Sequence, residues 1–201
     1  METEAEPEPE PVRRREAAAV DRPFVLALVC AVLAAVVGWT ELILVVPGWV
    51  LPHWVLGGIL LLAAAAVRIY RLSRRRPPAR AVTGWWWAAF TLPVVVAAAG
   101  IGLGGLGDVG AEYRVLEPAG PDGCRAVVRE NSFLVMGDGS VYAVHGFGFA
   151  LPGSSWIADD NMRPVAAGRY ELEWGERAGV LTLHRREGDP VMPALHGVDC
   201  R

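Results

Sequence analysis

Few residues in this 201-residue chain have the types and spacing that chemistry requires, and the cysteines are the most informative of them. Three cysteines are too few for a zinc site built from four thiolates. Cys30 lies within a long apolar stretch, whereas Cys124 and Cys200 lie in the more polar C-terminal half. If that half faces an oxidising compartment, we expect Cys124 and Cys200 to form a disulfide that fastens the C-terminal tail.

Glu41 and His53 are a second candidate pair. Glu41 is the one acidic residue in the apolar stretch 24–46, and His53 lies near the start of the next stretch. If both stretches are membrane helices, the two side chains lie near the same boundary and can pair. An ionisable group inside a membrane suggests proton or ion handling. However, Glu41 is about six residues from Pro47, roughly 9 Å, which favours a hydrated or paired carboxylate near the interface.

Four apolar residues in a Gly- and Pro-containing stretch form a candidate contact surface: Phe147, Phe149, Leu151 and Trp156. A small domain exposes so many apolar groups only where they contact something. The partner would be another protein or the outer face of a bilayer. The alternative is that these side chains are buried across a sheet.

Residues 100–105, Gly-Ile-Gly-Leu-Gly-Gly, match the dinucleotide pattern G-x-G-x-x-G. That pattern requires a preceding strand and a following helix in a soluble unit, whereas this match ends an apolar stretch. Gly100 and Gly104 also form G-x-x-x-G, which allows two helices to approach closely.

The remaining candidates for chemistry lack the required context. His145, His184 and His196 are not spaced as local metal ligands. Residues 154–155 are serines without a nucleophile elbow. We therefore expect no catalytic residues, no metal, no cofactor and no enzymatic activity.

Three long apolar stretches must position these residues. Hydrophobic residues make up 53% of the chain and concentrate in residues 24–46, 51–70 and 85–106. A helix of about 20 apolar residues crosses a hydrocarbon core of about 30 Å, so we expect each stretch to be a transmembrane helix.

Arginines predict the orientation of these helices. They lie before the first stretch and around the turn between the second and third, at positions Arg13, Arg14, Arg15, Arg22, Arg68, Arg71, Arg74, Arg75, Arg76 and Arg80. The link between the first and second stretches has none. Because positive charge stays in the cytoplasm, we expect a cytoplasmic N-terminus, with Ser73 inside and Gly120 outside.

Residues 108–201 differ in character from the rest. They contain 14 acidic and 9 basic residues, a net charge of −5, in short apolar runs that alternate with polar residues. This pattern predicts an antiparallel β domain of about five or six strands, either a sandwich or a curled sheet. We expect hairpin turns at residues 137–139 and 175–179, a loop over 151–164, and a tail over 188–201 with little structure.

The predicted architecture is a disordered cytoplasmic tail (residues 1–22), a three-helix transmembrane region (23–107) and an extracytoplasmic β domain (108–201). The net charge of −3 argues against a nucleic-acid partner. We expect a multi-pass cell-membrane protein, embedded in the lipid bilayer, whose β domain binds or senses an envelope protein. The alternative is an accessory subunit of a transport or export complex. The sequence leaves the ligand and the oligomeric state open.

Overall fold

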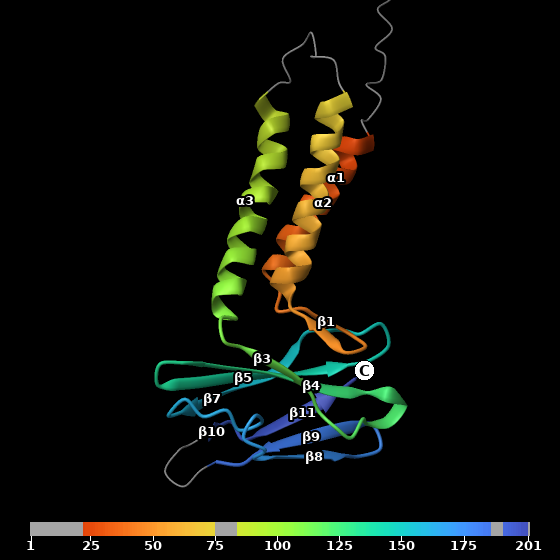
Figure 1. Cartoon of the computed structure of the whole chain (residues 1–201). Helices are drawn as coiled ribbons and strands as arrows, with labels where there is room; N and C mark the ends of the chain where they lie inside the picture. The colour runs from red at the N-terminus through yellow and green to blue at the C-terminus, as the bar shows by residue number, and fades with distance from the viewer. Residues whose placement is uncertain (1–21, 75–83, 186–190, 201) are drawn as a thin grey trace, which may run out of the picture.

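The computed structural model describes residues 22–74, 84–185 and 191–200, and all structural statements refer to these residues. The predicted cytoplasmic tail, residues 1–22, lies almost wholly outside them. Three helices rise side by side from one face of a stack of β-sheets (Figure 1). The predicted combination of apolar helices and antiparallel sheets is therefore confirmed.

The helical part contains α1 (Arg22–Gly38), α2 (His53–Arg74) and α3 (Gly84–Gly107). By length and composition, α2 and α3 are long and apolar enough to cross a membrane. α1 is also apolar but has only 17 residues.

Small side chains let the helices approach one another. Ala31, Ala34 and Ala97 have no exposed surface (0%). A side chain added at Gly100 of α3 would come within 2.8 Å of the carbonyl oxygen of Gly38 in α1. The G-x-x-x-G pair therefore contributes to packing between the helices, and the G-x-G-x-x-G match lies inside α3.

The prediction that residues 24–46 form one helix is wrong in its last part. Ile43–Val46 forms strand β1, which pairs with β2 (Trp49–Leu51) in a hairpin. This aliphatic run before a Pro-Gly pair suits a strand and a turn as well as it suits a helix. Ile43 is fully buried against Tyr142 of the β part, so tertiary packing favours the strand.

The β part contains three antiparallel sheets. A sheet of five strands has the order β10-β7-β5-β4-β3, and two sheets of three strands have the orders β11-β9-β8 and β2-β1-β6. Their strands beyond β2 are β3 (Glu112–Val115), β4 (Arg125–Phe133), β5 (Met136–Val144), β6 (Phe149–Ala150), β7 (Pro152–Asp159), β8 (Tyr170–Trp174), β9 (Ala178–Leu183), β10 (Val191–Met192) and β11 (Leu195–Asp199).

The five-stranded sheet is the middle layer. Its face toward β11-β9-β8 carries the main core, where Val128, Trp156 and Leu181 are buried together. Its other face is covered near the helices by the β1–β2 hairpin, through the contact between Ile43 and Tyr142. Both faces of the middle sheet therefore carry buried side chains. Within the described residues the predicted β domain contains nine strands, β3 to β11, more than the five or six expected.

The Asp-Gly turn predicted at residues 137–139 is also wrong. β4 and β5 are joined at residues 134–135, and the predicted turn lies inside β5. A side chain at Gly139 would collide with the indole of Trp156, and one at Gly137 would collide with the backbone carbonyl of Met162. These glycines therefore permit close packing within the sheet and do not form the turn.

Two segments expected to lack regular structure contain strands. β7 lies within the predicted loop 151–164 and pairs with β5 in the middle sheet. β10 and β11 lie within the predicted unstructured tail. In both segments alternate side chains are buried, including Trp156 in β7 and Val198 in β11, so hydrophobic burial favours strands despite the Ser, Gly and Pro residues.

Candidate functional site

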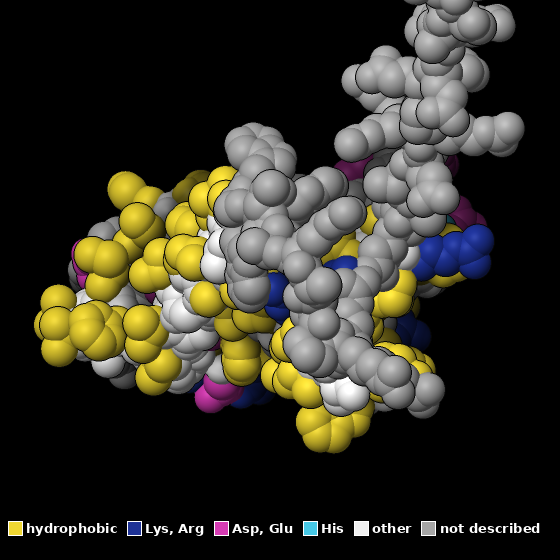
Figure 2. Space-filling model, turned by 90° about the horizontal axis from the view of Figure 1, so that it is seen from above, with side chains coloured by type: hydrophobic (Ala, Val, Ile, Leu, Met, Phe, Trp, Pro, Cys, Tyr) yellow, Lys and Arg dark blue, Asp and Glu magenta, His cyan; other side chains and the backbone are white. Residues whose placement is uncertain are grey.

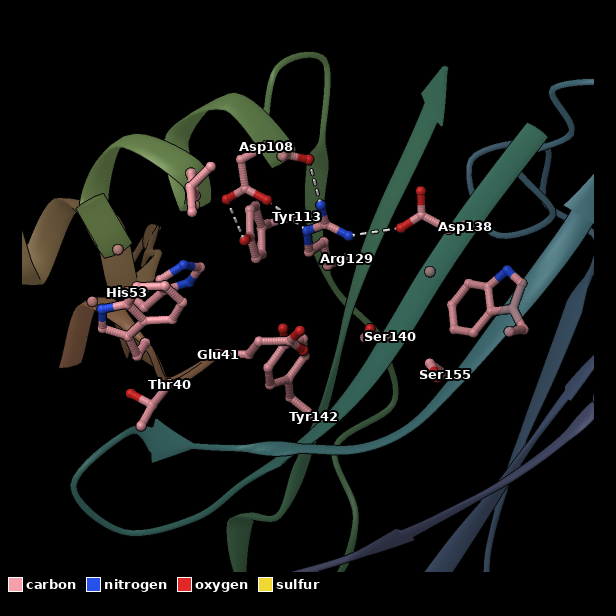
Figure 3. Close-up of a pocket in the computed structure, with 18 of the residues that line it drawn as sticks. Thr40, Glu41, His53, Asp108, Tyr113, Arg129, Asp138, Ser140, Tyr142 and Ser155 are labelled. Carbon is pink, nitrogen blue, oxygen red and sulfur yellow. Dashed lines mark hydrogen bonds and ion pairs between the residues drawn. The ribbon is translucent and has the colours of Figure 1, made fainter. Parts of the chain in front are cut away.

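A cavity of about 520 Å³ lies where the helices meet the β-sheets (Figure 3). Its walls come from the link after α1, the first residue of α2, the end of α3 and strands β3, β4, β5 and β7. Its volume is in the range of small-molecule sites. The polar residues that line it are Thr40, Glu41, His53, Asp108, Tyr113, Arg129, Asp138, Ser140, Tyr142 and Ser155.

A sharp turn after α1 places Glu41 in the cavity wall. The hydroxyl of Thr40 donates a hydrogen bond to the carbonyl of Val37 (3.0 Å), which closes the end of the helix. The indole N–H of Trp39 donates to the carbonyl of Val96 in α3 (2.9 Å). The first bond holds the link to the end of α1, and the second holds it against α3.

The predicted polar pair, Glu41 and His53, lines this one cavity (Figure 3). Glu41 lies in the link between α1 and β1, and therefore outside the helices, and its side chain is exposed. His53 is the first residue of α2, and Gly104 of α3 leaves room for its ring. Among the described residues, no hydrogen bond joins Glu41 to His53. The structure brings the two side chains to one cavity without pairing them directly.

Asp108, which follows α3 directly, is the centre of a polar network. One of its carboxylate oxygens accepts hydrogen bonds from the indole N–H of Trp54 and the hydroxyl of Tyr113, both at 2.8 Å. Its other oxygen accepts from Nε of Arg129 at 2.6 Å. We call these four residues, Asp108, Trp54, Tyr113 and Arg129, the joint. The joint links α2 and the end of α3 to strands β3 and β4.

The charges around the joint stabilise one another. Burial disfavours the charge of Arg129, but hydrogen bonds to Asp108 and to Asp138 (2.9 Å) outweigh burial and raise the pKa of Arg129. Burial and the bond to Asp108 raise the pKa of Tyr113, so its hydroxyl stays protonated as a donor. The cavity is lined by three carboxylates, those of Glu41, Asp108 and Asp138, and by the guanidinium of Arg129. It therefore has an excess of negative charge.

Sequence reasoning missed the joint. A weak signal was available, because Asp108 is the first charged residue after the uncharged stretch 85–106. Its partner Arg129 is 21 residues away, and no local pattern predicts that contact. The pairing becomes visible only when β3 and β4 are placed below α3.

The four residues predicted as a contact surface separate into two groups. Phe147, Phe149 and Leu151 are 95%, 53% and 59% exposed. Trp156 is 2% exposed and packs in the main core. Only the first three are therefore accessible to a partner.

The predicted disulfide between Cys124 and Cys200 is present, with the two Cα atoms 5.9 Å apart. It ties the residue before β4 to the residue after β11. Cys30 in α1 is a free cysteine. The bond therefore fastens the C-terminal strand to the middle sheet.

A serine–histidine contact in the β part is structural. His196 is 1% exposed, its Nε2 lies 3.0 Å from the carbonyl oxygen of Pro193, and its Nδ1 lies 2.9 Å from the hydroxyl of Ser154. Because a carbonyl only accepts, Nε2 carries the hydrogen and Nδ1 accepts from Ser154. Burial lowers the pKa of His196, which keeps the ring neutral. This buried contact links β7 to β11.

The polar groups of the cavity can form hydrogen bonds and ion pairs with a ligand. The cavity presents carboxylates, hydroxyls and an imidazole, but its one guanidinium is already held by Asp108 and Asp138. Within the described ranges, no group of three His, Cys, Asp or Glu residues is placed to hold a metal ion. No protein-family model, curated protein or solved structure matches this chain.

Proposed function

We propose that this chain is an integral membrane protein with three transmembrane helices, and that its extracytoplasmic β domain binds or senses an envelope partner without catalysis. The arginines before α1 and after α2 favour a cytoplasmic N-terminus. The lengths of α2 and α3 favour membrane crossing. α1 is roughly 26 Å long at 1.5 Å per residue, close to the thickness of a hydrocarbon core.

The joint and its cavity carry this proposal. Asp108 binds Trp54 of α2 on one side and Arg129 of β4 on the other, so the helices and the β domain meet through buried polar bonds. A ligand in the adjacent cavity would contact both parts at once, through His53 and Ser155 for example. Binding in this cavity could therefore change the position of the helices relative to the β domain. The excess of carboxylates favours a partner group that carries positive charge or donates hydrogen bonds.

Photocrosslinking in cells tests this proposal. A photoreactive amino acid would replace Ser155, which lines the cavity, or Glu176, which is exposed in the β8–β9 turn. We expect a specific adduct with an envelope protein at position 155 that Glu41→Gln weakens, and no such adduct at position 176. Equal labelling at the two positions, or no adduct at position 155, would contradict the proposal.

The alternative function, an accessory subunit of a transport or export complex, rests on the exposed apolar faces of the helices. Leu62, Leu92 and Val95 are 71%, 68% and 62% exposed and would contact either lipid or partner helices. The same photoreactive residue at Leu92 separates the two functions. An adduct with a membrane protein at position 92, without one at position 155, would favour the transport role.

A further inference from the structure

The turn between β4 and β5 carries four consecutive exposed apolar residues. Phe133, Leu134, Val135 and Met136 are 73%, 76%, 74% and 53% exposed. We call these four residues the hairpin tip. A run of this length in contact with water lowers solubility and is retained only where it has a role.

This hairpin is bonded to the end of α3 at positions close to the tip. The side-chain amide of Asn131 donates a hydrogen bond to the carbonyl of Gly107 (3.0 Å), and Nη2 of Arg129 donates to the same carbonyl (2.8 Å). Gly107 is the last residue of the apolar segment of α3. Phe133 is two residues from Asn131, which is about 7 Å along a strand. The hairpin tip therefore begins within the thickness of a headgroup layer from the end of α3.

The β4–β5 hairpin runs across the direction of the helices and ends beside the foot of α3 (Figure 1). In Figure 1 the end where β4 meets β5 extends sideways past the foot of α3, across the helix axes. Seen down the helices, yellow side chains gather at the left edge, over this end of the hairpin (Figure 2). Leu106 and Val109, at the foot of α3, are 72% and 69% exposed and extend the apolar surface toward the helix.

The conformation of the turn indicates that its side chains are needed. Leu134 has φ of 55°, a left-handed conformation that favours glycine or asparagine. A leucine there is less stable than a glycine would be, and it presents a large apolar group to the surroundings. Such local strain is typical of binding segments.

We propose that the hairpin tip inserts into the outer interface of the same bilayer that the helices cross, so that the β domain lies against the membrane at two points. This inference rests on the proposed membrane crossing but not on the proposed envelope partner. Asp159, which pairs with Met136, and the next residue, Asp160, are both exposed. Their charges limit insertion to the headgroup region and the first part of the acyl chains.

Lipid-quenching measurements on the full chain in phosphatidylcholine vesicles test this inference. A Cys30→Ala background leaves no free native thiol, because Cys124 and Cys200 are bonded to each other. An environment-sensitive fluorophore would be attached at Leu92→Cys in α3, Leu134→Cys in the tip or Glu176→Cys in the distant β8–β9 turn. Two sets of lipids would act as quenchers, one with a nitroxide near the headgroup end of the acyl chain and one with a nitroxide deeper along the chain.

We expect the fluorophore at position 134 to lose most of its emission, the one at position 92 to be quenched by deeper nitroxides, and the one at position 176 to be unaffected. Adding Phe133→Ser and Val135→Ser should restore the emission at position 134. Quenching at position 134 that persists in this variant would indicate insertion by the probe itself and would overturn the inference.

The other outcomes distinguish the two proposals. Quenching at position 92 with position 134 behaving like position 176 would overturn tip insertion and leave membrane crossing intact. A blue-shifted but unquenched probe at position 134 would indicate a protein contact, such as a second copy, and would also overturn it. Absence of quenching at position 92 would overturn the membrane crossing and, with it, this inference.

Discussion

The helical part and the β part differ in the kind of side chain that is buried inside each of them. Between the helices the buried residues are mostly small, including Ala31, Ala34 and Ala97. In the β part they also include large and polar side chains, such as Trp156, Tyr142 and His196. In the proposed membrane location, the helices would gain little from hiding apolar surface from one another, and close backbone approach would replace a bulky core. A domain surrounded by water gains most from burying large side chains.

This difference implies opposite sensitivities. The β part should fail when bulk is removed, and the helical part should fail when bulk is added. The joint should be sensitive to the loss of charge, because it buries an ion pair between the two parts. The first three predictions below each test one of these statements in the purified full chain, and the fourth concerns a buried polar contact within the β part.

The largest effect is expected from Trp156→Ala in the main core. The side chain is 2% exposed, and truncating a buried tryptophan costs about 3–5 kcal/mol. Thermal unfolding in detergent should show the β part strongly destabilised. Phe147→Ala, at a residue 95% exposed, is the matched control and should leave the melting temperature unchanged. Equal effects of the two variants would contradict the assignment of the core.

Asp108→Ala should have the next largest effect. It removes the acceptor of the Tyr113 hydroxyl and of the Trp54 indole, and it leaves Asp138 as the remaining carboxylate partner of Arg129 among the described residues. Breaking a buried pair costs about 3–5 kcal/mol, and the remaining carboxylate favours the lower end of that range. Asp138→Ala removes a carboxylate that is 45% exposed and should cost about 0–1 kcal/mol. A larger loss for Asp138→Ala, measured by the same thermal unfolding, would show that the joint is centred on the wrong residue.

Adding a methyl group to the helices should have a smaller effect. Gly100→Ala forces α3 away from Gly38 and Trp39, which should cost about 1–3 kcal/mol by overpacking. Gly102→Ala, two residues along the same helix, meets nothing within 4 Å and should be neutral. Helix separation can be followed by crosslinking between α1 and α3. Equal tolerance of the two substitutions would remove the distinction between the parts.

The smallest effect concerns pH. His196 is buried and its folded pKa is lower than the ordinary 6.5. As the pH falls below about 6.5, the unfolded chain binds a proton that the native ring does not bind, so stability decreases until the lowered folded pKa is passed. This loss of stability should be smaller in His196→Gln. The control, His145→Gln at an exposed residue, should keep the wild-type pH dependence of unfolding.

Sequence patterns predicted the elements that depend on local order. The apolar stretches gave α2 and α3, and the alternation around Leu172 gave the β8–β9 hairpin. The expectation that the β domain faces an oxidising compartment predicted the disulfide between Cys124 and Cys200. The signal for the helices and the hairpin lies within one segment of the sequence. The disulfide follows because Cys124 and Cys200 are the two cysteines of the predicted β domain.

Features that depend on tertiary contact were not predicted. The glycines at 137 and 139 resemble a turn, but they are required because a strand and the indole of Trp156 pass close by. The run ending at Val46 resembles a helix end, but the burial of Ile43 makes it a strand. The joint depends on Asp108 meeting Arg129 across the two parts. Such contacts have no local signature, so a sequence alone does not indicate them.

The central claim is that the membrane separates the end of α2 from the β domain, and thiol labelling tests it most directly. Ser73→Cys and Glu176→Cys, each in a Cys30→Ala background, would be exposed to a membrane-impermeant reagent in intact cells. Glu176 is preferable to Gly120, because a side chain at Gly120 would collide with the ring of Trp174. We predict labelling at position 176 in intact cells and at position 73 only after permeabilisation. Labelling at position 73 but not at position 176 in intact cells would contradict the account.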